Sequence, residues 1–241
     1  MKRMDDIDYA SYQGKLVFDN FDLGVLLEDD DFGTTSFNLN VDGSGFKLDN
    51  LNTKIQGVVY ELNYNNYNYS NIYASGALGD RIFNGLLNVN DENFKLDFEG
   101  LADFSETIQK YDFEANISYA NLKALNFVTR DSIGIFKGKV VVALSASSVD
   151  DAFGTINISN TTYLNENDKY YFEDFAITSQ FDNNQRTVTI NSPDIIEGTI
   201  TGDFRFVDIP ELVQNALGHI YTNYQPFKID KEQFLDFDFK I

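Results

Sequence analysis

The sequence has no cysteine and no tryptophan, and its one histidine is His219. Without cysteine the chain forms no disulfide and has no thiolate for redox chemistry. A single imidazole leaves an ordinary zinc site short of ligands. The absence of tryptophan also weakens an interpretation as a carbohydrate-binding module, which stacks aromatic rings on sugars. These absences exclude the common redox and zinc functions.

Basic residues are scarce as well. The 241 residues carry 18 lysines and arginines against 38 aspartates and glutamates, which gives a formal net charge of −20. This charge repels a phosphate backbone, so we expect no nucleic-acid partner. Apolar residues make up 43% of the chain and aromatic residues 15%, which is enough to bury a sizeable core.

Long apolar runs are missing. The longest uninterrupted one, 140–144, is far shorter than the roughly 18 to 20 residues that cross a bilayer. Near the amino end, Asp5, Asp6 and Asp8 stand where a secretory signal needs apolar residues. At the other end, 235–241 alternates apolar and polar residues up to the last position, as a strand does. We therefore expect the whole chain to be a piece of a longer protein, truncated at both ends.

The dominant pattern is a period of two, in which large apolar residues alternate with Asn, Asp, Lys or Ser. Such alternation is typical of antiparallel strands that are buried on one face and wet on the other. Turn compositions such as DGSG, NVNDEN, NENDK and FDNNQ separate the stretches. The apolar stripes are Phe37, Leu39 and Val41; Val58, Tyr60, Leu62 and Tyr64; Leu87 and Val89; Phe94, Leu96 and Phe98; Phe113, Ala115, Ile117 and Tyr119; Val140, Val142 and Leu144; Ile156 and Ile158; Val188 and Ile190; and Ile200, Phe204 and Phe206.

Several glycines share the parity of the apolar residues in their own strands. They are Gly85, Gly100, Gly138, Gly154, Gly198 and Gly202. Two interpretations remain open: the glycines allow the sheet to bend or bulge, or they keep space free for something that lies against the inner face.

Two segments break the alternation. From 208 to 221 the apolar spacing is helical, and Asp208, Pro210 and Glu211 suit the first turn of a helix. A shorter helical pattern covers 120–127. We expect both helices to pack as caps on the sheet rather than to bind a ligand.

The number of strands decides the architecture. About 190 residues in strands and tight turns, at roughly 10 to 12 residues per unit, predict about 16 to 19 strands, too many for one flat open sheet. Two closed sandwiches would bury their apolar faces against each other. One long curled sheet would instead leave a continuous apolar interior.

No catalytic constellation stands out. The only imidazole, His219, lies near the end of the expected helix, and paired carboxylates are too numerous to be informative. The acidic run 28–31 lacks the interleaved spacing of a calcium loop and indicates a solvated turn. The tyrosines at 64, 67 and 69 are interpreted as edge-strand residues. We predict no enzyme, no cofactor and no metal site.

The order and spacing of a series of strings are more specific than any single pattern. They are GKLVFDNFDLGVLL (14–27), TTSFNLNVDGSGFKLDNLNTKIQG (34–57), NYSNIYASGAL (68–78), NFKLDFEGLADFS (93–105), NISNTTYLNE (157–166), TVTINSPDIIEGTITGDF (187–204) and VDIPELVQNAL (207–217). Together, over nearly the whole chain, they resemble the middle of translocation and assembly module proteins of the TamB type, in the AsmA-like superfamily.

The resemblance implies a fold, a location and a cargo. Members are long envelope proteins of diderm bacteria, anchored in the inner membrane and reaching across the periplasm. The implied fold is all-β: a long, curled, mostly antiparallel sheet that forms an open apolar trough, called a β-taco. The implied partners are phospholipid acyl chains, with an outer-membrane barrel met by parts outside this segment, and the implied role is phospholipid transport or assistance to outer-membrane protein assembly. No catalytic residues come with the family.

What the resemblance transfers by position is the alternating lining of the trough. The candidates are Phe37, Leu39, Val41, Leu62, Leu87, Val89, Leu96, Phe98, Ile117, Val140, Val142, Ile156, Ile158, Val188, Ile190, Ile200, Phe204 and Phe206. The alternative hypothesis is a structural or adhesive surface protein made of β-sandwiches. It predicts closed cores and no bound lipid.

Overall fold

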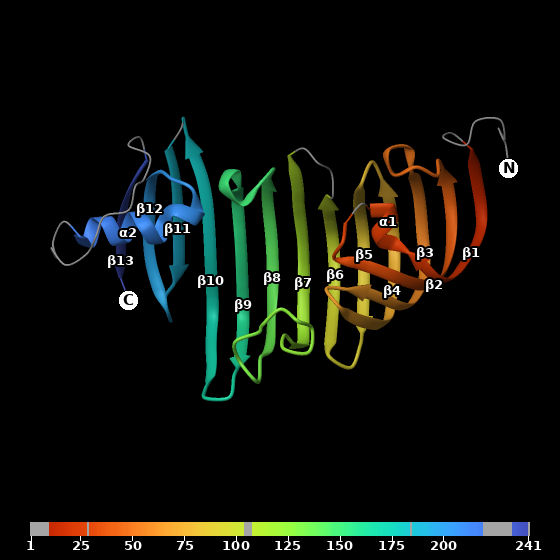
Figure 1. Ribbon diagram of the computed structural model, residues 1–241, viewed down its shortest axis with the longest axis horizontal. Helices are drawn as coiled ribbons and strands as arrows, with labels where there is room; N and C mark the ends of the chain where they lie inside the picture. The colour runs from red at the N-terminus through yellow and green to blue at the C-terminus, as the bar shows by residue number, and fades with distance from the viewer. Residues whose placement is uncertain (1–9, 28, 104–107, 184, 219–232, 241) are drawn as a thin grey trace.

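A computed structural model describes residues 10–27, 29–103, 108–183, 185–218 and 233–240. In these residues, 13 strands form one sheet in which every strand pairs antiparallel with its neighbours in sequence (Figure 1). The strands are β1 (Ser11–Asp22), β2 (Phe32–Ser44), β3 (Asn52–Tyr64), β4 (Tyr67–Gly79), β5 (Ile82–Asn90), β6 (Phe94–Asp103), β7 (Gln109–Asn121), β8 (Ile135–Ala146), β9 (Phe153–Leu164), β10 (Lys169–Asp182), β11 (Gln185–Ser192), β12 (Ile196–Asp203) and β13 (Phe234–Lys240).

The sheet is curled and open, because β1 and β13 form its two ends and do not pair with each other. This confirms the expected all-β trough and rules out two closed sandwiches within the described residues. The expectation of about 16 to 19 strands is wrong, because most strands span 12 to 14 residues rather than a few. At about 4.8 Å per strand the sheet extends roughly 58 Å across its strands.

One face of the sheet is apolar from end to end, because residues opposite each other in neighbouring strands project to the same side. One such row crosses six strands. It consists of Leu87, Phe98, Ala115, Val140, Ile158 and Phe175. The other face carries Asn, Asp, Glu and Lys side chains, such as Lys139, which pairs with Glu114 at 2.8 Å.

The open shape leaves a large accessible surface. The chain exposes 15380 Å², whereas a compact monomer of this mass exposes roughly 11,000 Å². The excess agrees with a single curved layer that has two faces and no second sheet. Most apolar side chains on the inner face are therefore only partly buried.

Three strands contain an asparagine in the left-handed region of φ: Asn20 (φ 53), Asn71 (φ 53) and Asn160 (φ 50). Asparagine adopts this conformation more readily than most residues. In β4, the apolar residues on either side of Asn71 are Tyr69 and Ile72, which pack into the same core cluster although they are not in strict alternation. Each extra residue keeps the apolar side chains on one face where plain alternation would turn them outward.

These irregularities correct two of the expected stripes. In β3, Val59 pairs with Phe37 and Ile72 and lies on the apolar face, so the expected positions Val58 and Tyr60 are wrong. In β7, Tyr119 pairs with the polar-face residue Lys95. The bulge in each strand shifts the phase of the alternation by one residue.

Five of the six glycines singled out in the sequence meet neighbouring backbone rather than open space, whereas a Cβ at Gly138 would first meet the Thr161 side chain. A Cβ added at Gly85, Gly154, Gly198 or Gly202 would overlap a carbonyl oxygen of the next strand. Gly100 has φ +141, and a Cβ there would overlap the carbonyl oxygen of Asp112. The geometry therefore favours close approach of curved strands over space reserved for a ligand.

The non-strand segments are short. They are α1 (Leu23–Leu27), α2 (Ile209–Gly218) and the 3₁₀ turns η2 (Leu48–Asn50), η3 (Val149–Asp151) and η4 (Phe206–Asp208). The expected helix at 208–221 thus corresponds to α2, with 219–221 outside the described residues.

The expected helix at 120–127 is wrong. Its residues continue β7 as far as Asn121 and then form turns. Asn126 has φ 64, in the left-handed region, where a right-handed helix cannot continue. Leu122 and Leu125 nevertheless pack on the sheet, whereas Phe127 is 54% exposed.

Asp91 joins the turn between β5 and β6 to strand β4. It is 3% exposed and accepts hydrogen bonds from the Tyr67 hydroxyl (2.6 Å), the Ser70 hydroxyl (2.7 Å) and amide (3.0 Å), and the Asn93 amide (2.8 Å). Burial alone raises the pKa of this carboxyl, but the hydrogen bonds from Tyr67, Ser70 and Asn93 outweigh it and hold the pKa below its usual value. Ionised Asp91 therefore stabilises the folded state.

We expect Gly100→Ala to lower the free energy of unfolding by about 1–3 kcal/mol, because alanine is strained at this φ and its methyl group meets backbone. Gly134→Ala is the matched control, since its Cβ has only ordinary contacts of 3.5 Å or more. Chemical denaturation measures both. Equal effects of the two substitutions would contradict the role given to Gly100.

We expect Asp91→Ala to cost about 2–4 kcal/mol, because it leaves buried donors without an acceptor, while Glu92→Ala on the exposed neighbour changes little. The folded-state pKa is lowered, so this stabilisation is present above the unfolded pKa of about 4 and is lost as pH falls through the folded value. The difference in the free energy of unfolding between wild type and Asp91→Ala should narrow as the pH is lowered from about 6 to about 2. A gap that stays constant would refute the assignment.

Candidate apolar trough

All the sequence-predicted lining residues except two lie on the apolar face, as their cross-strand partners show. For example, Leu39 lies opposite Leu16 and Gly57. Val142 likewise lies opposite Phe113 and Ile156. Contact of these residues with lipid stays a prediction. The structure shows only that these residues share one face of the sheet.

The two exceptions are Phe204 and Phe206. They were expected to continue the stripe of Ile200, but β12 ends before them, and Phe206 begins η4. Phe204 is 5% exposed and packs with Val188 and Leu212 in a core cluster. These rings fill the space between the sheet and α2, so their assignment as strand residues is wrong.

Sequence alternation also missed part of the lining. Phe175 and Ile177 of β10 lie opposite Ile158 and Ile156 on the apolar face. Their strand, KYYFEDFAITSQFD, has apolar residues at both parities. Only the pairing with β9 shows which parity faces inward.

Two segments cover parts of the trough. The turns after β7 place Leu125, 1% exposed, in a cluster with Tyr69, Ile72 and Val89. At the other end, α2 places Leu212 against Val188. The first cluster includes residues of β3 to β8, and the second includes residues of β10 to β13, so each segment covers part of the apolar face.

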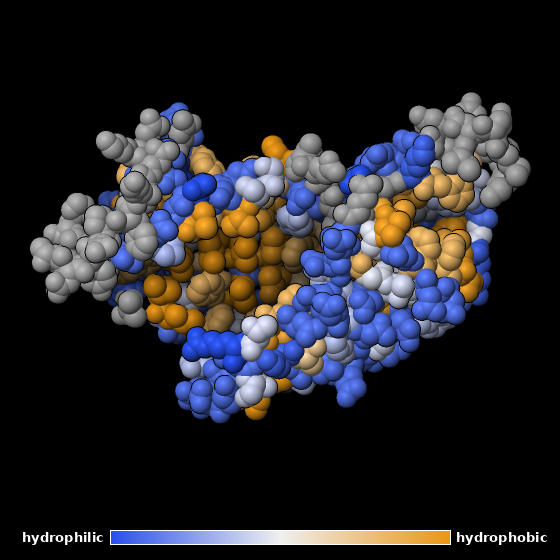
Figure 2. Space-filling model, in the orientation of Figure 1, coloured by the Kyte–Doolittle hydropathy of each residue, from blue (hydrophilic) through white to orange (hydrophobic). Residues whose placement is uncertain are grey.

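The centre of the apolar face has no such cover in the described residues. Figure 2 shows a hollow there, lined by apolar residues and bordered by hydrophilic ones, over β7 to β10. Val142, Ile156 and Ile177 follow one another across β8, β9 and β10 in this region. A chain of apolar atoms lying along this hollow would meet hydrocarbon on the protein side throughout.

A smaller cavity of about 250 Å³ lies beside α1, where Leu27 and Phe32 face Leu78 and Tyr111. Leu78 and Tyr111 belong to the apolar face, opposite Phe83 and Ala102 respectively. The cavity therefore adjoins the apolar face, and Asp29, Arg81 and Gln109 line its remaining part. Its volume is slightly below that of most small-molecule pockets, which start at about 300 Å³.

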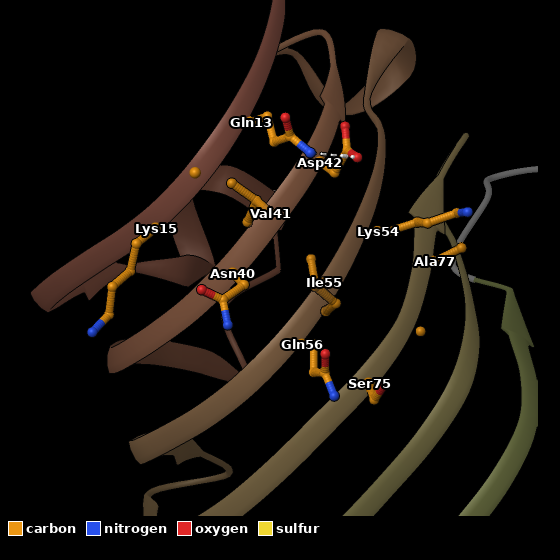
Figure 3. A pocket seen from close by; sticks show the side chains of 12 residues that line it. Gln13, Lys15, Asn40, Val41, Asp42, Lys54, Ile55, Gln56, Ser75 and Ala77 are labelled. Atoms are coloured by element: carbon orange, nitrogen blue, oxygen red, sulfur yellow. Dashed lines mark hydrogen bonds between the residues drawn. The ribbon is translucent and has the colours of Figure 1, made fainter.

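The polar face is hollowed too, but its chemistry is different. A hollow of about 690 Å³ is lined by polar side chains that include Lys15, Asn40, Gln56 and Ser75 (Figure 3). Gln13 donates a hydrogen bond to Asp42 at 3.2 Å across its upper part. Val41, Ile55 and Ala77 also line this hollow, so its lining is mixed.

The tyrosines near the β3–β4 hairpin are structural. Asn65 and Asn66 form its two-residue turn with φ 51 and 58, as a type I′ turn requires. Tyr69 is 7% exposed, and burial raises its pKa to about 12. The interpretation as edge-strand residues is wrong, because β3 and β4 lie inside the sheet.

The described part of the chain contains no group of three or more His, Cys, Asp or Glu side chains that could hold a metal. Asp29, Asp30 and Asp31 are exposed in the turn before β2. His219 lies outside the described residues. No helix in the described ranges has the length and apolar character needed to span a membrane.

Comparison of the chain with models of protein families, with curated proteins and with solved structures finds no match. The resemblance to TamB-type proteins therefore stays a prediction. The functional interpretation of the trough therefore depends on the geometry of the sheet and not on a known relative.

We expect Leu212→Ala to loosen α2 from the sheet and to expose more of the apolar face, because the lost packing is worth about 2–5 kcal/mol. Binding of an apolar fluorescent dye should rise while the sheet signal in circular dichroism is kept. Val207→Ala, on a residue that is 69% exposed, is the control and should leave dye binding unchanged. Loss of the sheet signal in Leu212→Ala would contradict the role of α2 as a cover.

Proposed function

We propose that this chain is a lipid-binding segment of an elongated envelope protein of the TamB type. Its trough holds the acyl chains of phospholipid as the lipid moves between the inner and outer membranes, or shelters apolar segments during outer-membrane protein assembly. The proposal places the chain in the periplasm, as part of a protein whose membrane anchor lies elsewhere. It requires no catalytic residue and no cofactor.

The observation that carries the proposal is a continuous apolar face without an opposing sheet. Rows of apolar residues cross the sheet strand by strand. In the middle of β8 and β9, Val140, Ile156 and Ile158 belong to neither covered cluster and are only partly buried, and Figure 2 shows an apolar hollow in this region. A soluble protein rarely exposes an apolar patch of this extent unless the patch binds something. An acyl chain is the ligand whose shape and chemistry match a long groove with no polar clamp.

The energetics support the same ligand. A chain of about 16 methylenes buried at about 0.8 kcal/mol each gains on the order of 10 kcal/mol. Even partial burial in an open groove leaves enough to hold a lipid. Because apolar contact is not directional, it also lets the chain slide along the trough. The bulged strands and inner-face glycines serve this purpose by curving the sheet around the ligand.

We expect Ile156→Asp to reduce the phospholipid that co-purifies with the protein at least about tenfold, because an unpaired charge at the centre of the groove opposes an acyl chain. Ile156 lies between Val142 and Ile177 and is only partly buried, so the change is compatible with folding. Quantitative mass spectrometry of organic extracts measures the bound lipid. Circular dichroism checks that the sheet is retained.

The matched control is Asn157→Asp. It introduces the same charge on the same strand, one residue along and on the polar face, where Asn157 is exposed. It should leave the bound phospholipid at the wild-type level. Wild-type protein without any phospholipid, or equal retention in the two variants, would overturn the proposed function.

A further inference from the structure

Arg186 is a charged residue on the apolar face. It lies near the start of β11, two positions before Val188, and pairs with Gly202 of β12 and Phe181 of β10. Its relative exposure is 1%. A fully buried arginine at the end of an apolar groove is costly unless its N–H groups are paired, so its surroundings decide its role.

Aromatic rings surround the guanidinium. Its central carbon lies 4.7 Å from the ring centroid of Phe181, 4.5 Å from that of Phe206 and 5.7 Å from that of Phe204. These cation–π contacts stabilise the positive charge without using its hydrogen-bond donors. The rings therefore hold the guanidinium in place and leave its N–H groups for other partners.

Only one of the three nitrogens has a partner in the described residues. Nη2 donates to the main-chain carbonyl oxygen of Asp150, whereas Nε and Nη1 have no hydrogen-bond partner. Nε–H and the N–H groups of Nη1 lie on opposite edges of the planar guanidinium, so they are two separate donor positions. Nη1, together with the second N–H of Nη2, can meet two oxygens of one carboxylate or phosphate. Unpaired donors on so buried a guanidinium are costly, and an anionic ligand would supply the missing acceptor.

The nearby carboxylates do not fill this site. One carboxylate oxygen of Asp150 accepts the Phe206 amide at 2.8 Å. The Asp151 carboxylate accepts hydrogen bonds from Ser147 and Ser148 in the turn before β9. Burial lowers the pKa of Arg186, and the charges of Asp150 and Asp151 act in the opposite direction. The two carboxylates thus favour the charged form of Arg186 without accepting hydrogen bonds from its Nε and Nη1.

We propose that Arg186 binds the oxyanion of an amphipathic lipid, a carboxylate or a phosphate, while the acyl chain lies along the trough. This rests on the proposed function and names the ligand class more narrowly: an anionic lipid instead of a neutral one. Val188 and Ile200 continue from Arg186 into the apolar face, so one molecule can meet both surfaces. Phe181 covers the guanidinium and is 44% exposed, and rotation of its ring opens the path to Nε and Nη1.

The test compares lipids that share a chain and differ only in the head. Oleate against oleyl alcohol, and dioleoyl phosphatidic acid against dioleoylglycerol, compete with a neutral apolar dye bound to the protein. We expect each anionic lipid to bind wild type about tenfold or more tightly than its neutral partner. Arg186→Met should reduce this ratio to near unity and leave the affinity for the neutral lipids unchanged. Methionine fills the apolar site without adding a buried charge.

The outcomes separate this inference from the proposed function. If anionic and neutral lipids bind wild type equally, or if Arg186→Met keeps the preference, the inference is wrong and the trough still binds lipid. If none of the lipids binds, the proposed function itself fails. Inorganic phosphate alone serves as a further probe, and competition by it as strong as that by phosphatidic acid would show a site for free anions and overturn the lipid assignment.

A measurement on wild-type protein keeps the test valid if Arg186→Met does not fold. The ¹⁵N resonance of the Arg186 Nε–H group, assigned by comparison with Arg186→Lys, should shift on addition of oleate and stay in place on addition of oleyl alcohol. Lysine keeps the charge but lacks the Nε–H group and the planar arrangement of donors. A resonance that responds to neither lipid, or to both alike, would contradict the proposal.

Discussion

The structure depends on the cross-strand register that keeps one face of the sheet apolar over all the described strands. Residues that oppose each other in neighbouring strands share a face, so a slip of one residue in any strand would turn its apolar side chains into water. At Asn20, Asn71 and Asn160 the strands depart from regular geometry, and the apolar side chains still lie on one face. Each adds a residue where the alternation would otherwise fall out of phase.

The same constraint explains why the sheet curls. A flat sheet with one apolar face would expose that face entirely, whereas a curved one brings its apolar side chains together. Curvature requires neighbouring backbones to approach closely, which the inner-face glycines permit. Leu125 and the residues of α2 then cover the apolar face toward the two ends. Between these covered parts, Val140, Ile156 and Ile158 in the middle of β8 and β9 stay only partly buried.

Alternation in the sequence predicted the fold class and the apolar face, because a period of two is a direct consequence of strand geometry. It did not predict where bulges change the phase, so Val58 was expected in place of Val59. It also did not predict that Phe204 leaves the strand to pack against Leu212, since this contact depends on the path of the chain after β12. The number of strands was overestimated because strand length is not visible in the alternation itself.

Arg186 was not predicted as a site residue either. In the sequence it is one of the few basic residues and follows a turn, which suggests an exposed position. Its burial arises from three phenylalanines that come from separate segments and meet only in the folded sheet. Isolated charges of this kind become informative when the structure shows which of their donors are unpaired.

The most direct test of the account is photo-crosslinking with a phospholipid that carries a diazirine near the middle of one acyl chain. After irradiation of the purified protein, mass spectrometry of its peptides locates the adducts. The account predicts adducts on apolar-face residues of β7 to β10, such as Val140 and Ile177, and none on their polar-face neighbours. Adducts spread equally over both faces, or absent from the centre of the trough, would contradict it.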